Sequence, residues 1–330
     1  MTEDSFTAEV ENVRLDHVIH HVLRDILCIE PSDSLLILAE ASMIESAMPF
    51  VQVDGSLCED IVLITVPDGP GSLLHLSEDL EQLLCRRSAF IALTRRGFTH
   101  TAARRAACEA GARGLTMPNA TSELLHSGAV LADYEAIANA SEALANHLTG
   151  SSSCTVRSSL GTELEFDVTD GVWFAERGIC DRPGDFGNLP GGEVSIAPVN
   201  AQGILVIDGS INPLGLLNNP LRLTIENRRV VDIAGERADE LRSFLNSFGP
   251  DAFNVAEIAL GTNPGADVTG ITVKDEKALG TIHVGFGNNS NMGGFSRASK
   301  VNVPVHIDAV LRDSVHFLAD GLSVEAQSFF

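Results

Sequence analysis

Basic residues are scarce in this chain of 330 residues. Only 22 Lys and Arg stand against 45 Asp and Glu, and the formal net charge at pH 7 is −23. Binding to nucleic-acid phosphates or to anionic lipid depends on Lys and Arg, so the charge argues against both partners. Aromatic residues that stack on bases are also few, since Trp173 and Tyr134 are the single residues of their types. We therefore expect no nucleic-acid partner and no membrane partner.

Cysteine pairs and long apolar runs are missing as well. The six cysteines are widely spaced and form no CxxC pair, which argues against a structural zinc site or a thioredoxin-like motif. No run of 18 apolar residues occurs, so the sequence predicts no transmembrane helix. The first residues, MTEDSFTAEVE, are acidic and polar, unlike a signal peptide. We expect a protein of the reducing cytoplasm.

The length and the apolar fraction of 44% are sufficient for two domains with cores of their own. The stretch Gly150-Ser151-Ser152-Ser153 is typical of a linker. We therefore place one domain in residues 1–150 and a second domain in residues 151–330.

The first domain alternates apolar strands with helical segments. This order predicts a doubly wound, Rossmann-like α/β domain with a parallel sheet. Neither a GxGxxG motif nor a Walker loop occurs at its strand-to-helix turns, so no nucleotide site is predicted there. The predicted strands are 35–39, 61–66 and 90–94, and the predicted helices are 18–27, 42–48, 80–87, 99–112 and 129–148.

The sequence pattern of the second domain is different, with short predicted strands separated by Gly, Pro and Asn. We expect a β-rich α+β domain with one helix near residues 236–245. The predicted strands are 154–157, 163–168, 193–197, 204–208, 221–226 and 230–232, together with the apolar runs around Glu257, His283 and His306.

Residues of metal-ligand type gather in this second domain, each in or beside an apolar run. They are Glu193, Glu257, His283, His306 and Asp308. A carboxylate or imidazole among apolar neighbours is costly to bury unless it is paired or coordinated. His306 and Asp308 are two positions apart, so on a strand both point to one face. The set predicts a shared cation site, although each residue alone is more often a paired polar group.

Five nitrogen and oxygen ligands exceed what a single catalytic zinc ion takes from protein. They suit two divalent ions per chain, which polarise a carbonyl and activate a water molecule for hydrolysis of an amide or peptide bond. The ligand types fit Zn, Co, Mn, Mg or Fe without choosing among them. Glu276 is a candidate catalytic residue that would shuttle the proton.

A loop rich in Gly and Asn, residues 285–294, follows His283. It either borders a substrate pocket or forms an ordinary flexible hairpin. Asn288 and Asn289 in this loop and Arg297 beyond it are candidate substrate-binding residues, whereas solvated surface charge is the default for Arg297.

The motifs GGEVSIAP, AEIALGTNP, DEKALGTIHVGFGNN and VHIDAVL resemble the aminopeptidase T / aminopeptidase S family of leucyl aminopeptidase-like metallopeptidases. The resemblance covers most of the chain, and its specific motifs lie in residues 188–308. It implies a dinuclear metal site in the C-terminal domain and a homodimer that encloses the active sites. The resemblance places all five candidate ligands on the metal-ligand positions of that family.

The chain departs from the peptidases at Ser290, where their pattern has a tyrosine near the metals. A related branch, 2,5-dihydroxypyridine 5,6-dioxygenase, uses the same scaffold for iron(II)-dependent ring cleavage. In that branch, the positions of Glu193 and His283 are apolar and the position of Glu257 is His. At these three positions the chain has the residues that are typical of the peptidases.

Three hypotheses follow for the function of the protein. The expected substrate is a small peptide, an amide or an aromatic compound. The first is a dinuclear metallohydrolase of the aminopeptidase type. The second is a non-haem iron(II) extradiol-type dioxygenase that cleaves a hydroxypyridine-like ring, with His283, His306 and Asp308 as a triad. The third is a binding protein without catalytic activity that kept the scaffold.

Overall fold

The computed structural model describes residues 15–69, 74–99, 101–290, 292–313 and 315–330. The acidic N-terminus, His100 of an expected helix and Asn291 of the expected loop lie outside these ranges.

The chain divides into two compact units. Unit 1 consists of residues up to Glu135 together with Gly178–Gly191, and unit 2 consists of Ala136–Arg177 together with Gly192–Phe330. The single boundary expected at residue 150 is therefore replaced by three crossings. The reason is that helix α6 (Tyr134–Leu148) packs Leu144 and Leu148 into the core of unit 2, whereas residues 186–188 return to the sheet of unit 1.

Unit 1 is built on a parallel sheet of five strands in the order β2-β1-β3-β4-β8. The predicted parallel α/β architecture is confirmed, and β4 and β8 are two strands that the sequence analysis missed. The strands are β1 (Ser34–Glu40), β2 (Asp60–Val66), β3 (Ala89–Leu93), β4 (Arg113–Thr116) and β8 (Phe186–Asn188).

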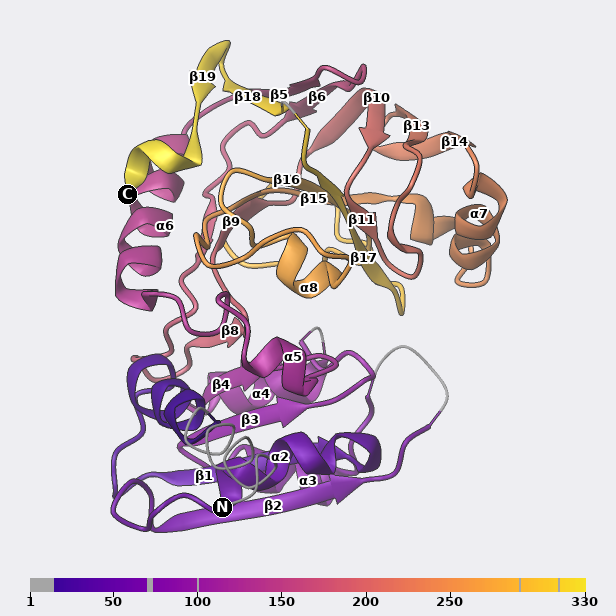
Figure 1. Ribbon diagram of the computed structural model, residues 1–330. Coiled ribbons are helices and arrows are strands. Elements are labelled where there is room, and N and C mark those ends of the chain that lie inside the picture. Colours follow the sequence, from indigo (N-terminus) through magenta and orange to yellow (C-terminus); the bar gives the residue numbers. More distant parts are fainter. Residues whose placement is uncertain (1–14, 70–73, 100, 291, 314) are drawn as a thin grey trace, which may run out of the picture. The chain divides into compact units, whose positions relative to one another are not determined.

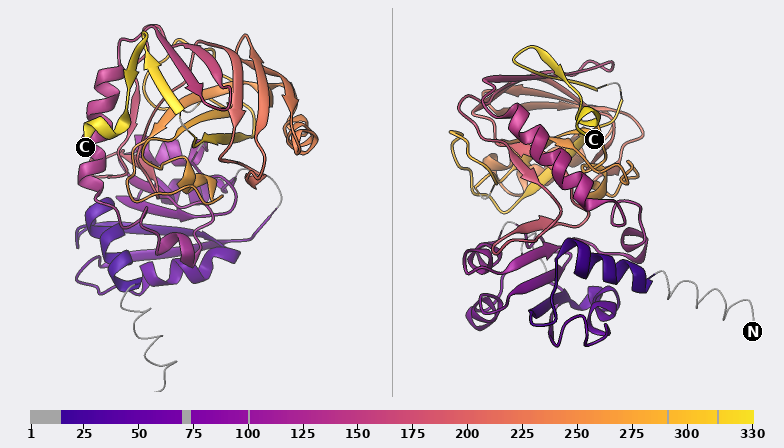
Figure 2. Two further views of the ribbon diagram at one scale, coloured as in Figure 1. Left: turned by 45° about the horizontal axis from the view of Figure 1, so that its top comes forward. Right: turned by 90° about the vertical axis from the view of Figure 1, so that its left-hand side faces the viewer.

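Helices lie on both sides of this sheet, as Figure 2 shows. Leu36 and Phe90 on one face of the sheet share a core with Leu84 of α3 and Ala103 of α4. Coverage of both faces explains why these strands are continuous apolar runs. The helical elements are η1 (His21–Ile26), η2 (Ala41–Met43), α2 (Ile44–Val51), α3 (Glu78–Leu84), α4 (Ala102–Glu109) and α5 (Ser122–Leu125).

Unit 2 contains two antiparallel sheets of seven strands each, in the orders β14-β13-β10-β6-β5-β18-β19 and β12-β11-β17-β16-β15-β9-β7. Figure 1 shows the two sheets stacked on each other. The first sheet contains β5 (Ser153–Ser158), β6 (Glu163–Asp167), β10 (Asn200–Ile207), β13 (Leu221–Glu226), β14 (Arg229–Ala234), β18 (Val315–Ala319) and β19 (Leu322–Val324). The second contains β7 (Phe174–Glu176), β9 (Glu193–Ile196), β11 (Ser210–Ile211), β12 (Gly215–Leu216), β15 (Val255–Gly261), β16 (Ile282–Gly287) and β17 (His306–Leu311).

The core of unit 2 fills the space between its two sheets. Leu205 and Leu223 of the first sheet belong to the same buried cluster as Ile258 and Val284 of the second. Because side chains alternate along a strand, residues 257, 283, 306 and 308 point to the opposite face of the second sheet. The remaining helical elements of unit 2 are α7 (Ala238–Asn246), η3 (Pro250–Phe253), α8 (Thr272–Asp275) and η4 (Ala326–Phe329).

Among the residues that the structure describes, no helix has the length and apolar character needed to cross a membrane.

Candidate metal centre

One row of residues crosses three neighbouring strands of the second sheet. Glu257 of β15 lies opposite Gly285 of β16, and Gly285 lies opposite Asp308 of β17. A Cβ atom at position 285 would lie 2.7 Å from Cγ of Glu257 and 3.0 Å from Oδ1 of Asp308. Glycine is therefore needed at this position, because it leaves the space into which both carboxylates project.

His306 completes a compact group of ligand atoms. Its Nε2 atom lies 3.1 Å from Oε1 of Glu257 and 3.2 Å from Oδ1 of Asp308. Each of the three residues offers one ligand atom, and these atoms all lie within 4.8 Å of one another. We call Glu257, His306 and Asp308 the ligand triad.

The hydrogen bond of the other imidazole nitrogen tests whether the triad fits a metal ion. Nδ1 of His306 lies 2.7 Å from the backbone oxygen of Asn288. A carbonyl oxygen only accepts, so Nδ1 carries the proton and donates. In neutral His306 the lone pair of Nε2 then faces two carboxylates, an arrangement that requires a cation between them. A backbone carbonyl that orients a ligating histidine in this way is common at metal sites.

The charge state of His306 agrees with this interpretation. Burial lowers the pKa of His306, but the Asp308 and Glu257 carboxylates outweigh it and raise the pKa well above the usual value. Burial raises the pKa of Glu257, but hydrogen bonds with His283 and His306 outweigh it and lower the pKa. The three groups together therefore hold a cation, either a proton or a metal ion.

The remaining two predicted ligands lie beside the triad. His283 is fully buried, and its Nε2 atom lies 3.3 Å from Oε2 of Glu193 and 3.8 Å from Oε1 of Glu257. Glu193 begins β9 and pairs with Gly261 of β15. The five side chains named from the sequence thus meet on one face of one sheet, and their binding of a metal ion stays a prediction.

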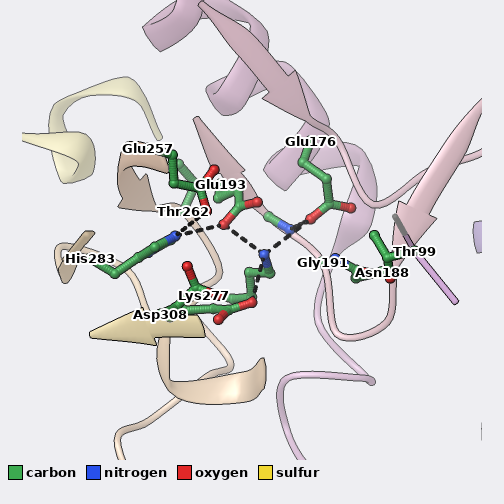
Figure 3. Close-up of polar contacts among 12 residues, drawn as sticks. Thr99, Glu176, Asn188, Gly191, Glu193, Glu257, Thr262, Lys277, His283 and Asp308 are labelled. Carbon is green, nitrogen blue, oxygen red and sulfur yellow. Dashed lines mark hydrogen bonds and ion pairs between the residues drawn. The ribbon is translucent and has the colours of Figure 1, made fainter. Parts of the chain in front are cut away.

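Lys277 enters this cluster, and the sequence analysis missed it. Its side chain is 1% exposed, and Nζ lies 2.6 Å from Oε2 of Glu193, 3.0 Å from Oε1 of Glu276 and 3.8 Å from Oε2 of Glu176. Figure 3 shows Lys277 and His283 pointing toward the Glu193 carboxylate from different sides. Glu176 of β7 lies directly opposite Glu193 in the sheet, so the ammonium offsets the repulsion of two facing carboxylates.

Two local features bring Lys277 to this position. The buried Asp275 carboxylate accepts hydrogen bonds from Oγ of Ser210 and from the backbone N–H groups of Thr269 and Gly270, which anchors α8. A Cβ atom at Gly261 would lie 2.2 Å from the backbone oxygen of Ala278, so only glycine lets this segment cross the strand. Lys277 could not be identified from the sequence, because the run Asp275-Glu276-Lys277 is also typical of a solvated surface.

The charges in this part of the site are strongly coupled. Burial raises the pKa of Glu193, but Lys277 and His283 outweigh it and lower the pKa to about 2. Burial raises the pKa of Glu276 to about 8, with a further increase from the Asp308 charge and an opposing effect from Lys277. Glu193 is therefore ionised at neutral pH, whereas Glu276 carries a proton that it can exchange.

The candidate substrate residues have local partners. Nδ2 of Asn288 donates to the backbone oxygen of Val303, and Nδ2 of Asn289 donates to that of Ser299. Arg297 forms an exposed ion pair with Asp170 at 2.9 Å. These contacts shape the loop and the surface, and the proposed roles in substrate binding stay predictions. Within the described part of the chain, Arg297 makes no ion pair with the ligand triad.

Comparison with known proteins identifies the family to which the sequence is similar. A family model described as 2,5-dihydroxypyridine 5,6-dioxygenase (NicX) matches residues 72–325. No curated protein matches the sequence at a significant level.

Two solved structures share the fold. A 2,5-dihydroxypyridine dioxygenase from Pseudomonas putida KT2440 is 20% identical, with a TM-score of 0.77 over 95% of this chain and 96% of that chain. AmpT from Thermus thermophilus is 16% identical, with a TM-score of 0.67 over 95% of this chain and 97% of that chain. The aminopeptidase affiliation that the sequence predicted is thus supported as a likeness of fold to AmpT. The family model that matches is that of the related dioxygenase branch. Since that match spans more than half of the sequence, the chain belongs to the 2,5-dihydroxypyridine 5,6-dioxygenase family.

Proposed function

We propose that this protein is a metal-dependent dioxygenase that cleaves the ring of a dihydroxypyridine-like aromatic compound. The observation that carries the proposal is the ligand triad, which gathers in a chain whose family is that of a ring-cleaving dioxygenase. The triad contains one histidine and two carboxylates, so Glu257 takes the place of the second histidine of the two-His-one-carboxylate arrangement. The second hypothesis from the sequence thus becomes the preferred one, with Glu257 rather than His283 in the triad.

Glu257, His306 and Asp308 would hold an iron(II) ion, which would supply the chemistry that activates O2 toward a hydroxylated ring. Glu257 and Asp308 provide two negative charges that balance a divalent ion, and Asn288 fixes the imidazole of His306 through its backbone oxygen. In the overall reaction one carbon–carbon bond of the ring breaks and both atoms of O2 enter the product. No external reductant is required, because the ring supplies all the electrons.

Glu276 is the residue that we assign to proton transfer. Its pKa, raised by burial to about 8, leaves it protonated at neutral pH but able to exchange that proton. It is close enough to Asp308 for the charge of Asp308 to contribute to this shift. The hydroxyl groups of the substrate must lose a proton as they bind a cation, and Glu276 together with water can relay it.

A metallohydrolase is the second candidate, and one observation favours it. Glu193 and His283, which match the peptidases rather than the dioxygenase branch, lie next to Glu257 of the triad. Hydrolysis by two ions would require a second divalent cation at Glu193. Lys277 already makes the closest of these ion pairs with that carboxylate, so we rank this function second.

The two functions differ in their need for oxygen. The protein is loaded anaerobically with iron(II) and mixed with 2,5-dihydroxypyridine in an oxygen electrode. We expect O2 consumption in proportion to the loss of ring absorbance, with Asp308→Asn inactive and His316→Ala, an exposed histidine on β18, unaffected. Hydrolysis of dipeptides or amides that proceeds equally well without oxygen, combined with no O2 uptake on any hydroxypyridine, would reject the proposal.

A further inference from the structure

We propose that the ammonium group of Lys277 is a built-in cation that occupies the place of a second metal ion, so that the chain binds one divalent ion rather than two. This inference rests on the proposed metal site at the ligand triad. It replaces the two ions per chain that the sequence analysis expected.

The contacts of Lys277 are those that a second cation would make. Its Nζ atom lies among three carboxyl groups, those of Glu193, Glu276 and Glu176, at 2.6, 3.0 and 3.8 Å. All four side chains are buried, and Lys277 is among the largest fully buried side chains. Carboxylates that converge in a buried site need a positive charge, and here the protein supplies it covalently.

The backbone that carries Lys277 is firmly anchored. Its backbone oxygen accepts a hydrogen bond of 2.8 Å from the N–H of Asn263, and its segment crosses tightly over Gly261. The preceding helix α8 is anchored through Asp275. A divalent ion at Glu193 would therefore lie next to the ammonium group of Lys277, and like charges at such a distance repel strongly.

Glu193 and His283 then acquire a different role from the one expected. Nε2 of His283 lies between Oε2 of Glu193 and Oε1 of Glu257, at 3.3 and 3.8 Å. Lys277 fixes Glu193, Glu193 faces His283, and His283 faces the carboxylate that belongs to the triad. Glu193, Lys277 and His283 are thus positioning residues that hold Glu257, and the metal ion is left to Glu257, His306 and Asp308.

Metal stoichiometry tests this inference without any activity measurement. The metal-stripped protein is titrated with Mn²⁺ and with Zn²⁺ by calorimetry, and the bound metal is counted by elemental analysis after desalting. The variants are Lys277→Ala, which removes the ammonium and opens space, and Lys277→Ala combined with Glu193→Gln. Lys300→Ala, at an exposed lysine, is the matched control.

We expect one ion per chain for the wild type and for Lys300→Ala, two for Lys277→Ala, and one again for the double variant. Two ions per wild-type chain would overturn the inference, and this measurement stands even if Lys277→Ala does not fold. A folded Lys277→Ala protein that still binds one ion would also overturn it. One bound ion together with oxygen-independent amide hydrolysis would refute the proposed function and leave this inference intact.

Discussion

Glu257 and Asp308 lie on two strands that are separated by a single strand, and both pair in register with the same residue, Gly285. The carboxylates reach toward each other across a position without a side chain. The sheet register, rather than any loop, thus determines the spacing of the two ligands. Sites that are built on strands hold their geometry more closely than sites on loops.

This relationship gives a first prediction, for Gly285→Ala. The added methyl group would lie 2.7 Å from Cγ of Glu257 and would displace its carboxylate. We expect the affinity for Mn²⁺ to fall by roughly 10- to 100-fold, as for the loss of a group that orients a ligand. Competition titration with a fluorescent chelator measures it. Gly55→Ala is the control, because no atom lies within 4 Å of its added Cβ, and equal affinities of the two variants would contradict the assignment.

The second prediction concerns His306, whose Nε2 atom faces both carboxylates of the triad. His306→Ala removes one of three ligands, and we expect loss of stoichiometric metal binding together with loss of oxygen uptake. His316→Ala on β18 should retain both. If His306→Ala bound metal with unchanged affinity, as measured by calorimetry, the triad would be wrongly assigned.

The third prediction concerns the loop that orients His306. The side chain of Asn288 donates to Val303 and accepts from Ser290, while its backbone oxygen accepts from His306. Asn288→Ala removes the side-chain anchors, so we expect a roughly tenfold weaker metal affinity with an intact fold. Circular dichroism and metal titration provide the two readouts. Asn246→Ala, exposed at the end of α7, should change neither.

The fourth prediction is a pH dependence of folding stability. Although burial opposes it, Lys277 and His283 lower the pKa of Glu193 from 4.5 to about 2. A lowered pKa means that ionised Glu193 stabilises the folded state above pH 4.5 and that this contribution disappears as the pH falls through 2. Glu193→Gln should therefore destabilise the metal-free protein most above about pH 5, on the order of 3 kcal/mol.

Urea unfolding in the presence of a chelator, at several pH values between 2.5 and 7, measures this difference. The gap between wild type and Glu193→Gln should narrow steadily as the solution becomes more acidic. A gap that stays constant with pH would show that Glu193 is not held as an ion by Lys277 and His283.

Much of the fold follows from local patterns in the sequence. The apolar runs of β1, β2 and β3 alternate with helical segments, and this order is sufficient to predict the parallel sheet. Strands β4 and β8 were missed because Arg113–Thr116 and Phe186–Asn188 are short and carry no clear periodicity. The pairing of β8 with β4 joins residues about 70 positions apart, which no local pattern specifies.

Local patterns in the sequence also predicted part of the candidate site. His306 and Asp308 share a face because they are two positions apart on a strand, which the sequence alone indicates. The position of Lys277 depends on the tight crossing over Gly261 and on the anchoring of Asp275, which are contacts between distant segments. A charged residue next to a helix is usually solvated, so the sequence favoured the wrong environment for Lys277.

The most direct test of the metal site is an anomalous difference map from a crystal grown with Mn²⁺, recorded where manganese scatters strongly. We expect a single peak per chain, bounded by Glu257, His306 and Asp308, with Lys277 still in contact with Glu193. A second peak beside Glu193, with Lys277 displaced, or a peak away from the triad, would contradict the account.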